Sequence, residues 1–215
     1  MGQKVNPHVF RLKTVHTWDS RWFNERGYKD MVLEDFHLRN ALMQRLRSAG
    51  VAKIELERSI NSLKIIIHVS RPGIVIGRGG SGLEELKKFI AKFFEAERTD
   101  HSAPKLDILV EPVKEPNLDA YLVAVSIGDQ LIRRLPYKRV LATTSDRVMA
   151  AGAKGVRIML SGRIAGSEIG RREKIQKGTV PLSTIREAIH YAQVPALTKK
   201  GYIGVKVWIN KEEDK

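Results

Sequence analysis

The sequence contains no cysteine, and this absence excludes several kinds of chemistry. Without cysteine there is no disulfide framework, no thiol nucleophile and no zinc or iron-sulfur centre held by thiolates. Long apolar runs are also missing, since the longest fall far short of the ~20 residues that span a bilayer. The N-terminal segment lacks the apolar core of a secretion signal. We therefore expect a soluble cytoplasmic protein with no membrane partner.

Acidic residues are few relative to basic ones, and this imbalance points to a class of partner. Asp and Glu number 24 against 38 Lys and Arg, which gives a formal net charge of +14 over 215 residues. The 42% hydrophobic content is typical of a folded chain rather than a disordered tail. The excess charge therefore lies on a folded surface, and the expected partner is a polyanion.

Hydrophobic periodicity in the first half predicts a helix, a hairpin, two more helices and a third strand. Residues 1–28 show no sustained period, so we expect an irregular arm whose aromatics Trp18, Trp22 and Phe23 pack on the residues that follow. Ser81 and Glu84 have the spacing of a capping box at the start of the last helix. The predicted helices cover 30–49, 72–76 and residues from 81 onward, and the predicted strands cover 51–56, 63–69 and 106–110, with a turn at Asn61 and Ser62.

The second half carries helical spacing and then strand patterns. Helices are predicted over 117–135 and 137–152, and strands over 156–160, 168–175, 186–194 and 205–209. Helices packed on one face of a mainly antiparallel sheet would satisfy this order. The fold class is therefore α+β, with two domains.

A glycine-rich loop interrupts the two helices of the first half. Gly77, Gly79 and Gly82 match the G-x-G-x-x-G dinucleotide fingerprint, but a helix rather than a strand precedes them, so the context excludes that site. The segment 77–80 instead matches the G-x-x-G loop of KH nucleic-acid-binding modules. Glycines let a phosphate backbone approach the main chain, and a helix N-terminus adds positive potential. A glycine-rich turn without a ligand is the alternative. The candidate RNA-binding residues are Arg71, Gly77, Arg78, Gly79, Gly80, Lys87 and Lys88.

Two groups of basic residues occur in the second half. The first contains Arg133, Arg134, Lys138, Arg139 and Arg147, at spacings that let several share a helix face. The second contains Arg163, Arg171, Arg172, Lys174 and Lys177 on strands and the turn between them, and strand alternation should separate Arg171 from Arg172. Each group is interpreted as a phosphate-binding surface. The alternative for the first group is a solvated helix face, and the alternative for the second is an edge strand whose charges prevent aggregation. The C-terminal RNA-binding candidates are Arg147, Lys154, Arg163, Arg171, Arg172 and Lys174.

Catalysis finds little support in the sequence. The six histidines are scattered, and no metalloprotease, nucleophile-elbow or paired-carboxylate pattern occurs. His68 lies within an Ile-rich segment and is interpreted as a core or groove residue. We therefore expect no enzyme activity, no cofactor, no metal and no small-molecule substrate.

Five sequence blocks, spread over nearly the whole chain, together resemble one known family. They are MGQKVNP at 1–7, RPGIVIG at 71–77, GAKG at 152–155, SGR at 161–163 and GVKVWI at 204–209. They resemble the bacterial small-subunit ribosomal proteins of the uS3 family, with a type II KH domain. The resemblance implies an N-terminal arm at 1–29, a KH domain at 30–112, a C-terminal α/β domain at 113–211 and a short charged tail at 212–215.

The same resemblance implies partners and site residues. The expected partners are small-subunit rRNA in the head, mRNA at the entry channel, and the neighbouring proteins uS10 and uS14. Lys138 and Arg139 match two basic residues of the family that line the mRNA entry channel, while Ala142 stands where the family has a third. With their neighbours, the mRNA entry candidates are Arg133, Arg134, Lys138 and Arg139.

Two positions of the arm depart from the family pattern. Val9 and Lys13 stand where the family usually carries glycine, so a positive φ there would force the arm onto another path. A free KH-domain RNA-binding regulator or RNA chaperone is the alternative function. Such a regulator would need no match to the ribosomal C-terminal blocks, so the second domain discriminates between the two.

Overall fold

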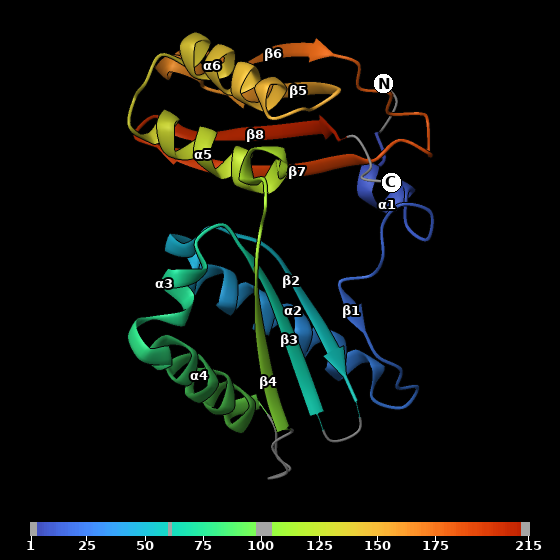
Figure 1. Ribbon diagram of the computed structural model, residues 1–215. Helices are drawn as coiled ribbons and strands as arrows, with labels where there is room; N and C mark the ends of the chain where they lie inside the picture. The colour runs from blue at the N-terminus through green and yellow to red at the C-terminus, as the bar shows by residue number, and fades with distance from the viewer. Residues whose placement is uncertain (1–3, 60–61, 98–104, 212–215) are drawn as a thin grey trace. The chain divides into compact units, whose positions relative to one another are not determined.

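The computed structural model describes residues 4–59, 62–97 and 105–211, and it divides the chain into two compact units. The glycine-loop unit runs from Trp18 to Lys114, and the C-terminal unit joins the residues up to Thr17 with those from Glu115 onward (Figure 1). The predicted arm at 1–29 is thus shared between the two units. Predictions for residues 1–3, Asn61 and the tail at 212–215 lie outside the described residues.

The glycine-loop unit contains a mixed sheet in the order β1-β2-β3-β4. The central β2-β3 pair is antiparallel, as predicted for a hairpin, whereas β4 pairs with β3 in parallel. A short strand from the arm, β1, adds a fourth strand to the three that were predicted. In chain order the elements are β1 (Ser20–Arg21), α2 (Tyr28–Arg45), η1 (Arg47–Ala49), β2 (Val51–Arg58), β3 (Ser62–Val69), α3 (Pro72–Ile76), η2 (Arg78–Gly80), α4 (Ser81–Glu97) and β4 (Lys105–Pro112).

The core of this unit lies between the sheet and the helices α2 and α4. Leu42 of α2 and Ile90 of α4 are fully buried against Ile65 and Ile67 of β3. Gly50 adopts a left-handed conformation, with φ 69°, and ends the helical segment as predicted. The alternation of strand residues leaves mostly charged side chains on the other face of the sheet, with Ile66 and Leu109 among them, and no helix of the described ranges covers it.

The C-terminal unit contains an antiparallel sheet in the order β6-β5-β8-β7. Helix α5 covers β7 and β8, and helix α6 covers β5 and β6, on the same face of the sheet (Figure 1). The elements are α1 (Pro7–Phe10), η3 (Pro116–Leu118), α5 (Ala120–Ile132), α6 (Tyr137–Ala150), β5 (Gly155–Gly162), η4 (Ile164–Gly166), β6 (Arg171–Gly178), β7 (Ile189–Thr198) and β8 (Gly201–Asn210). The predicted helices on a mainly antiparallel sheet are confirmed.

Strand alternation determines which side chains meet the two helices. Val156, Ile158 and Leu160 of β5 are fully buried on the helix side, while Arg157 and Met159 point to the opposite side. Asp119 caps α5 by accepting hydrogen bonds from the backbone N–H groups of the next turn. In the part of the chain that the structure describes, this sheet therefore has one packed face and one face without helices.

Within the C-terminal unit, the arm is held by Arg11, which is fully buried. Its guanidinium donates hydrogen bonds to five backbone carbonyls, four of them in the β6-β7 connection. Val9 lies in helix α1, whereas Lys13 has a φ of 69°. Lys13 thus adopts the left-handed conformation that favours glycine although it carries a side chain.

None of the helices in the described ranges is both long enough and apolar enough to cross a membrane.

Candidate nucleic-acid interface

The glycine loop links α3 to α4 through three residues with positive φ. Gly77, Gly79 and Gly80 have φ values of 70°, 62° and 85°. Ser81 has helical dihedral angles, so it begins α4 and does not adopt the extended conformation of the predicted cap. Helix α3 precedes the loop at the place where a dinucleotide site requires a strand.

The glycines of this segment perform two different tasks. A Cβ on Gly82 would lie 2.4 Å from the carbonyl oxygen of Val75, and a Cβ on Gly77 would lie 2.9 Å from the backbone nitrogen of Gly82. These two glycines allow α3 and α4 to approach each other. At Gly79 and Gly80 a Cβ would meet nothing within 4 Å, so their main chain faces open space. An external phosphate backbone can approach the protein at those two residues.

The structure places cationic side chains around this loop. Arg71 immediately precedes α3, Arg78 lies in the loop, and Lys87 and Lys88 lie further along on α4, all exposed. Beside these cations, Ile74 and Ile76 of α3 are 50% and 37% exposed, while Val75 between them is buried. This exposed apolar pair was not predicted from the sequence. Exposed apolar side chains next to a phosphate-binding loop suit contact with bases.

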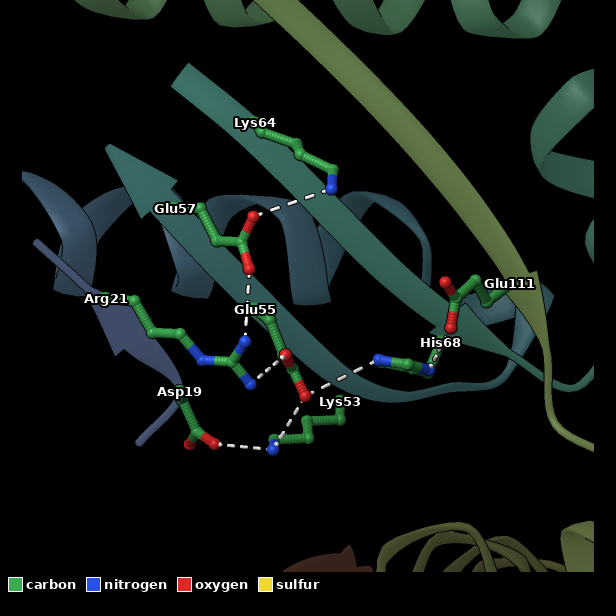
Figure 2. Close-up of polar contacts among 8 residues, drawn as sticks. All are labelled: Asp19, Arg21, Lys53, Glu55, Glu57, Lys64, His68 and Glu111. Carbon is green, nitrogen blue, oxygen red and sulfur yellow. Dashed lines mark hydrogen bonds and ion pairs between the residues drawn. The ribbon is translucent and has the colours of Figure 1, made fainter. Parts of the chain in front are cut away.

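The helix-free face of the glycine-loop sheet has a different character, because its cations are paired with carboxylates (Figure 2). Arg21 contacts two glutamates at 3.1 and 3.2 Å, and Lys53 contacts Asp19 and Glu55 at 3.0 and 2.9 Å. Lys64 lies 3.5 Å from a carboxylate oxygen of Glu57.

These contacts leave little charge for an external anion. Burial opposes the charged form of Lys53, but its hydrogen bonds to Glu55 and Asp19 outweigh that effect and raise the pKa of Lys53. His68 lies between Glu55 and Glu111 on the same face, at 3.6 and 3.4 Å, rather than in the core or a groove as the sequence suggested. The cations of this face are therefore neutralised by carboxylates of the same chain.

Four members of the first basic group of the C-terminal unit lie around the start of α6, whereas Arg147 lies in the last turn of that helix. Lys138 and Arg139 occupy the first turn of that helix, and all members of the group are exposed. Arg133 and Arg134 lie in the connection from α5 instead of on a shared helix face, and Arg134 has a φ of 62°. Ala142 is exposed one turn after Lys138, so a longer side chain there would join the same surface.

The residues at the start of α6 suit the binding of an anion but do not stabilise the helix. No acidic residue occupies the first turn, and Pro136 before it provides no side-chain cap. Cations at a helix N-terminus oppose the macrodipole by about 0.3 to 1 kcal/mol each, so Lys138 and Arg139 do not stabilise the helix. A bound phosphate would neutralise them and accept from the free N–H groups.

The second basic group is separated by strand alternation, as predicted. Arg171 lies toward α6, where its guanidinium is 5.7 Å from the ring centroid of Tyr137 and 3.5 Å from Glu173. Lys177, on the same side, pairs with Asp146 of α6. Arg172 and Lys174 are exposed on the face without helices. The structure thus joins Arg171 to the α6 group, which sequence reasoning had kept apart.

The remaining candidates lie at the ends of β5. Arg163 is exposed after the strand and donates from Nε to the carbonyl oxygen of Ser167 at 2.9 Å. Lys154 is exposed before the strand, and its backbone N–H donates to Asn210. Among the described residues, no group of three or more His, Asp or Glu side chains could hold a metal ion.

Fold and surface together define a KH-type RNA-binding module joined to a second, basic α/β unit. A KH domain model matches residues 37–118, and the model described as "Ribosomal protein S3, C-terminal domain" matches residues 127–209. The chain belongs to the family of the small ribosomal subunit protein uS3. The resemblance seen in the sequence is therefore confirmed.

Curated relatives support the assignment over almost the whole chain. Small ribosomal subunit protein uS3 of Lachnoclostridium phytofermentans is 44% identical over 209 residues, covering 97% of this chain and 92% of the relative. The corresponding protein of Geobacter sulfurreducens is 45% identical over 213 residues, covering 99% and 97%. That of Lactobacillus helveticus is 42% identical over 213 residues, covering 99% and 92%.

Proposed function

We propose that this chain is a structural, non-enzymatic component of the small ribosomal subunit in the bacterial cytoplasm, binding small-subunit rRNA and contacting mRNA at its entry. The observation that supports this most strongly is the family match in both units, at residues 37–118 and 127–209. A free KH-domain regulator would not need the ribosomal C-terminal domain, so the match at 127–209 removes the main support for that alternative.

The glycine loop supplies the first RNA contact in this proposal. Its open main chain at Gly79 and Gly80 accepts a ribose-phosphate backbone, and the surrounding cations add charge. Exposed Ile74 and Ile76 then receive the bases. The residues proposed to bind RNA here are Arg71, Gly77, Arg78, Gly79, Gly80, Lys87 and Lys88.

The start of α6 supplies the mRNA contact. Arg133, Arg134, Lys138 and Arg139 are exposed together and are not offset by acidic residues in the first turn of the helix. We propose that they touch the mRNA backbone, and that uS10 and uS14 are protein neighbours of this chain. Chemical cross-linking of assembled small subunits tests this assignment of neighbours. Cross-links from this chain to neither uS10 nor uS14 would contradict it.

The test of the central proposal is a sucrose gradient of native lysate, repeated after a high-salt wash. Sedimentation with the small subunit in both gradients is expected for an integral ribosomal protein. Recovery only among the free proteins near the top would overturn the ribosomal function and return the KH-domain regulator as the better candidate.

A further inference from the structure

The helix-free face of the C-terminal sheet, termed the open face, carries an unpaired set of cations. Its side chains are set by the strand register, because Lys174 of β6, Met159 of β5 and Lys206 of β8 lie in one cross-strand row. Arg157 lies in the next row between Gln176 and Trp208. Arg172 lies in the row on the other side of Lys174. The open face therefore presents Arg157, Arg172, Lys174 and Lys206.

Within the described strands, no carboxylate shares the open face with these four cations. Glu173, the one acidic residue of β6, points to the helix side and pairs with Arg171. Among the described residues, none of the four cations forms an ion pair. The corresponding face of the glycine-loop sheet is the opposite case, since Arg21, Lys53 and Lys64 all contact carboxylates (Figure 2). Of the two faces, the open face is the one that leaves its charge for an external anion.

Arg157 shows the imbalance most clearly. Its guanidinium lies 5.1 Å from the ring centroid of Trp208, and its buried Nε has no hydrogen-bond acceptor among the described residues. Leaving a buried donor without an acceptor costs about 1 to 3 kcal/mol. Trp208 is only 5% exposed beneath it and packs against Tyr191, with ring centroids 5.2 Å apart. The ring orients Arg157 but offers no surface for base stacking, so the open face offers charge for phosphates.

The spacing of the four cations is set by sheet geometry. Lys174 and Lys206 are two strands apart, about 9.6 Å, and alternate residues along a strand are about 6.8 Å apart. The cations therefore cover about 10 by 14 Å across three rows. A surface of this size can meet several phosphates of a folded RNA at once, and each contact adds to the salt dependence of binding.

We propose that the open face binds backbone phosphates of folded small-subunit rRNA, on the opposite side of the sheet from the start of α6. This inference rests on the proposed ribosomal function and assigns Arg157 and Lys206 a role in it. The C-terminal unit then contacts RNA on both sides, with rRNA on the sheet and mRNA on the helices. An acidic protein segment is the competing occupant that the experiment must separate.

The experiment measures binding of the full chain to deproteinised bacterial small-subunit rRNA over a series of KCl concentrations. The test variant combines Arg172→Gln, Lys174→Gln and Lys206→Gln, and spares Arg157 because it covers Trp208. The control variant removes the same charge from exposed positions of the same unit, with Arg186→Gln, Lys199→Gln and Lys200→Gln. Amine-reactive footprinting of the wild type, with and without rRNA, reports on Lys174 and Lys206 directly.

The expected result is a test variant whose slope of log affinity against log salt is shallower by about 2 to 3, at about 0.7 to 0.9 per lost phosphate contact. The control should change the slope by less than one such contact, and rRNA should protect Lys174 and Lys206 from the reagent.

Other results would overturn the inference in recognisable ways. If the wild type binds rRNA, the test variant keeps the same slope and both lysines stay reactive, the open face does not bind rRNA. The proposed ribosomal function would be unaffected by that result. Equal loss in both variants would show that only total charge matters. Normal rRNA binding with loss of the test variant from assembled subunits would identify a protein occupant. No wild-type binding at all would count against the proposed function itself.

Discussion

Arg11 of the arm donates a hydrogen bond from Nε to the backbone carbonyl of Glu187, at 2.8 Å and across 176 residues of sequence. The other guanidinium nitrogens bond Pro7, Pro181, Leu182 and Thr184. Burial lowers the pKa of Arg11, while the Glu187 carboxylate acts in the opposite direction. One side chain thus holds both the arm and the β6-β7 connection.

We expect Arg11→Lys to release the arm. A lysine has one nitrogen and cannot reach carbonyls on several sides, so at least two of them would lose their donor at about 1 to 3 kcal/mol each when buried. Hydrogen exchange of residues 8–16 should rise by at least tenfold in the full chain. The matched control is Arg186→Lys, because Arg186 is exposed in the same connection. Unchanged exchange in the Arg11 variant would contradict this role.

Lys13 and Val9 form a natural pair for testing backbone strain in the arm. Lys13 has a φ of 69°, where a side chain costs about 1 to 2 kcal/mol, whereas Val9 is helical. Lys13→Gly relieves that strain, and the greater freedom of the unfolded chain offsets about 0.5 to 1 kcal/mol of the gain. We expect a small stabilisation, by up to about 1 kcal/mol, in denaturant unfolding.

Val9→Gly should have the opposite sign, with a loss of about 0.3 kcal/mol or more, because glycine is less favourable within a helix than valine. Lys13→Asn separates strain from entropy, since asparagine tolerates the left-handed region while keeping a side chain. Equal effects of the two glycine substitutions would show that φ at Lys13 is not the cause.

Asp35 of α2 is the buried anion on which the start of the glycine-loop unit depends. It is 3% exposed and accepts from Trp22 Nε1 at 2.8 Å and from Arg58 Nε at 2.7 Å. Asp35→Asn should lower the free energy of unfolding by about 1 to 3 kcal/mol, because buried Arg58 loses one charged partner but keeps its ion pair with Glu34 at 2.8 Å. Asp107→Asn, at an exposed position on β4, is the control, and calorimetry of the full chain is the measurement.

Local patterns predicted the elements well because the forces that form them are local. Gly50 stops a helix, Pro72 starts one, and the alternation in β5 and β6 separates helix-facing from outward residues. The division of the arm was not visible, because it depends on Arg11 meeting carbonyls far along the chain. The Trp22–Asp35 hydrogen bond was not predicted either, because it depends on how the arm packs against α2.

The candidate site was predictable in composition but not in arrangement. Every basic candidate proved exposed, yet sequence alone could not pair Arg171 with Tyr137 or place Arg157 over Trp208. Strand register sets the Arg157–Trp208 pair, and the packing of α6 on β6 sets the Arg171–Tyr137 pair. The exposure of Ile74 and Ile76 depends likewise on how α3 packs.

The glycine loop allows a charge test with isosteric variants. Gly79→Asp and Gly79→Asn differ only in charge, and both side chains tolerate the φ of 62° found there. A Cβ at this position meets nothing within 4 Å, so both variants should fold. We expect Gly79→Asp to weaken single-stranded RNA binding by at least tenfold, about 1.4 kcal/mol, through repulsion of phosphate. Gly79→Asn should remain within about threefold of the wild type, and equal losses in both would mean that the loop acts only through shape.

Ala142 tests whether the start of α6 engages mRNA. It is exposed one helical turn after Lys138, so a lysine there would extend the surface of Lys138 and Arg139. We expect subunits carrying Ala142→Lys to translate hairpin-containing messages faster, and their salt slope for single-stranded RNA to steepen by about 0.7 for one added phosphate contact. Ala150→Lys adds the same charge at an exposed position two turns further along α6, about 12 Å away, and should change neither readout. Unchanged passage through hairpins in the Ala142 variant would show that Lys138 and Arg139 do not guide mRNA.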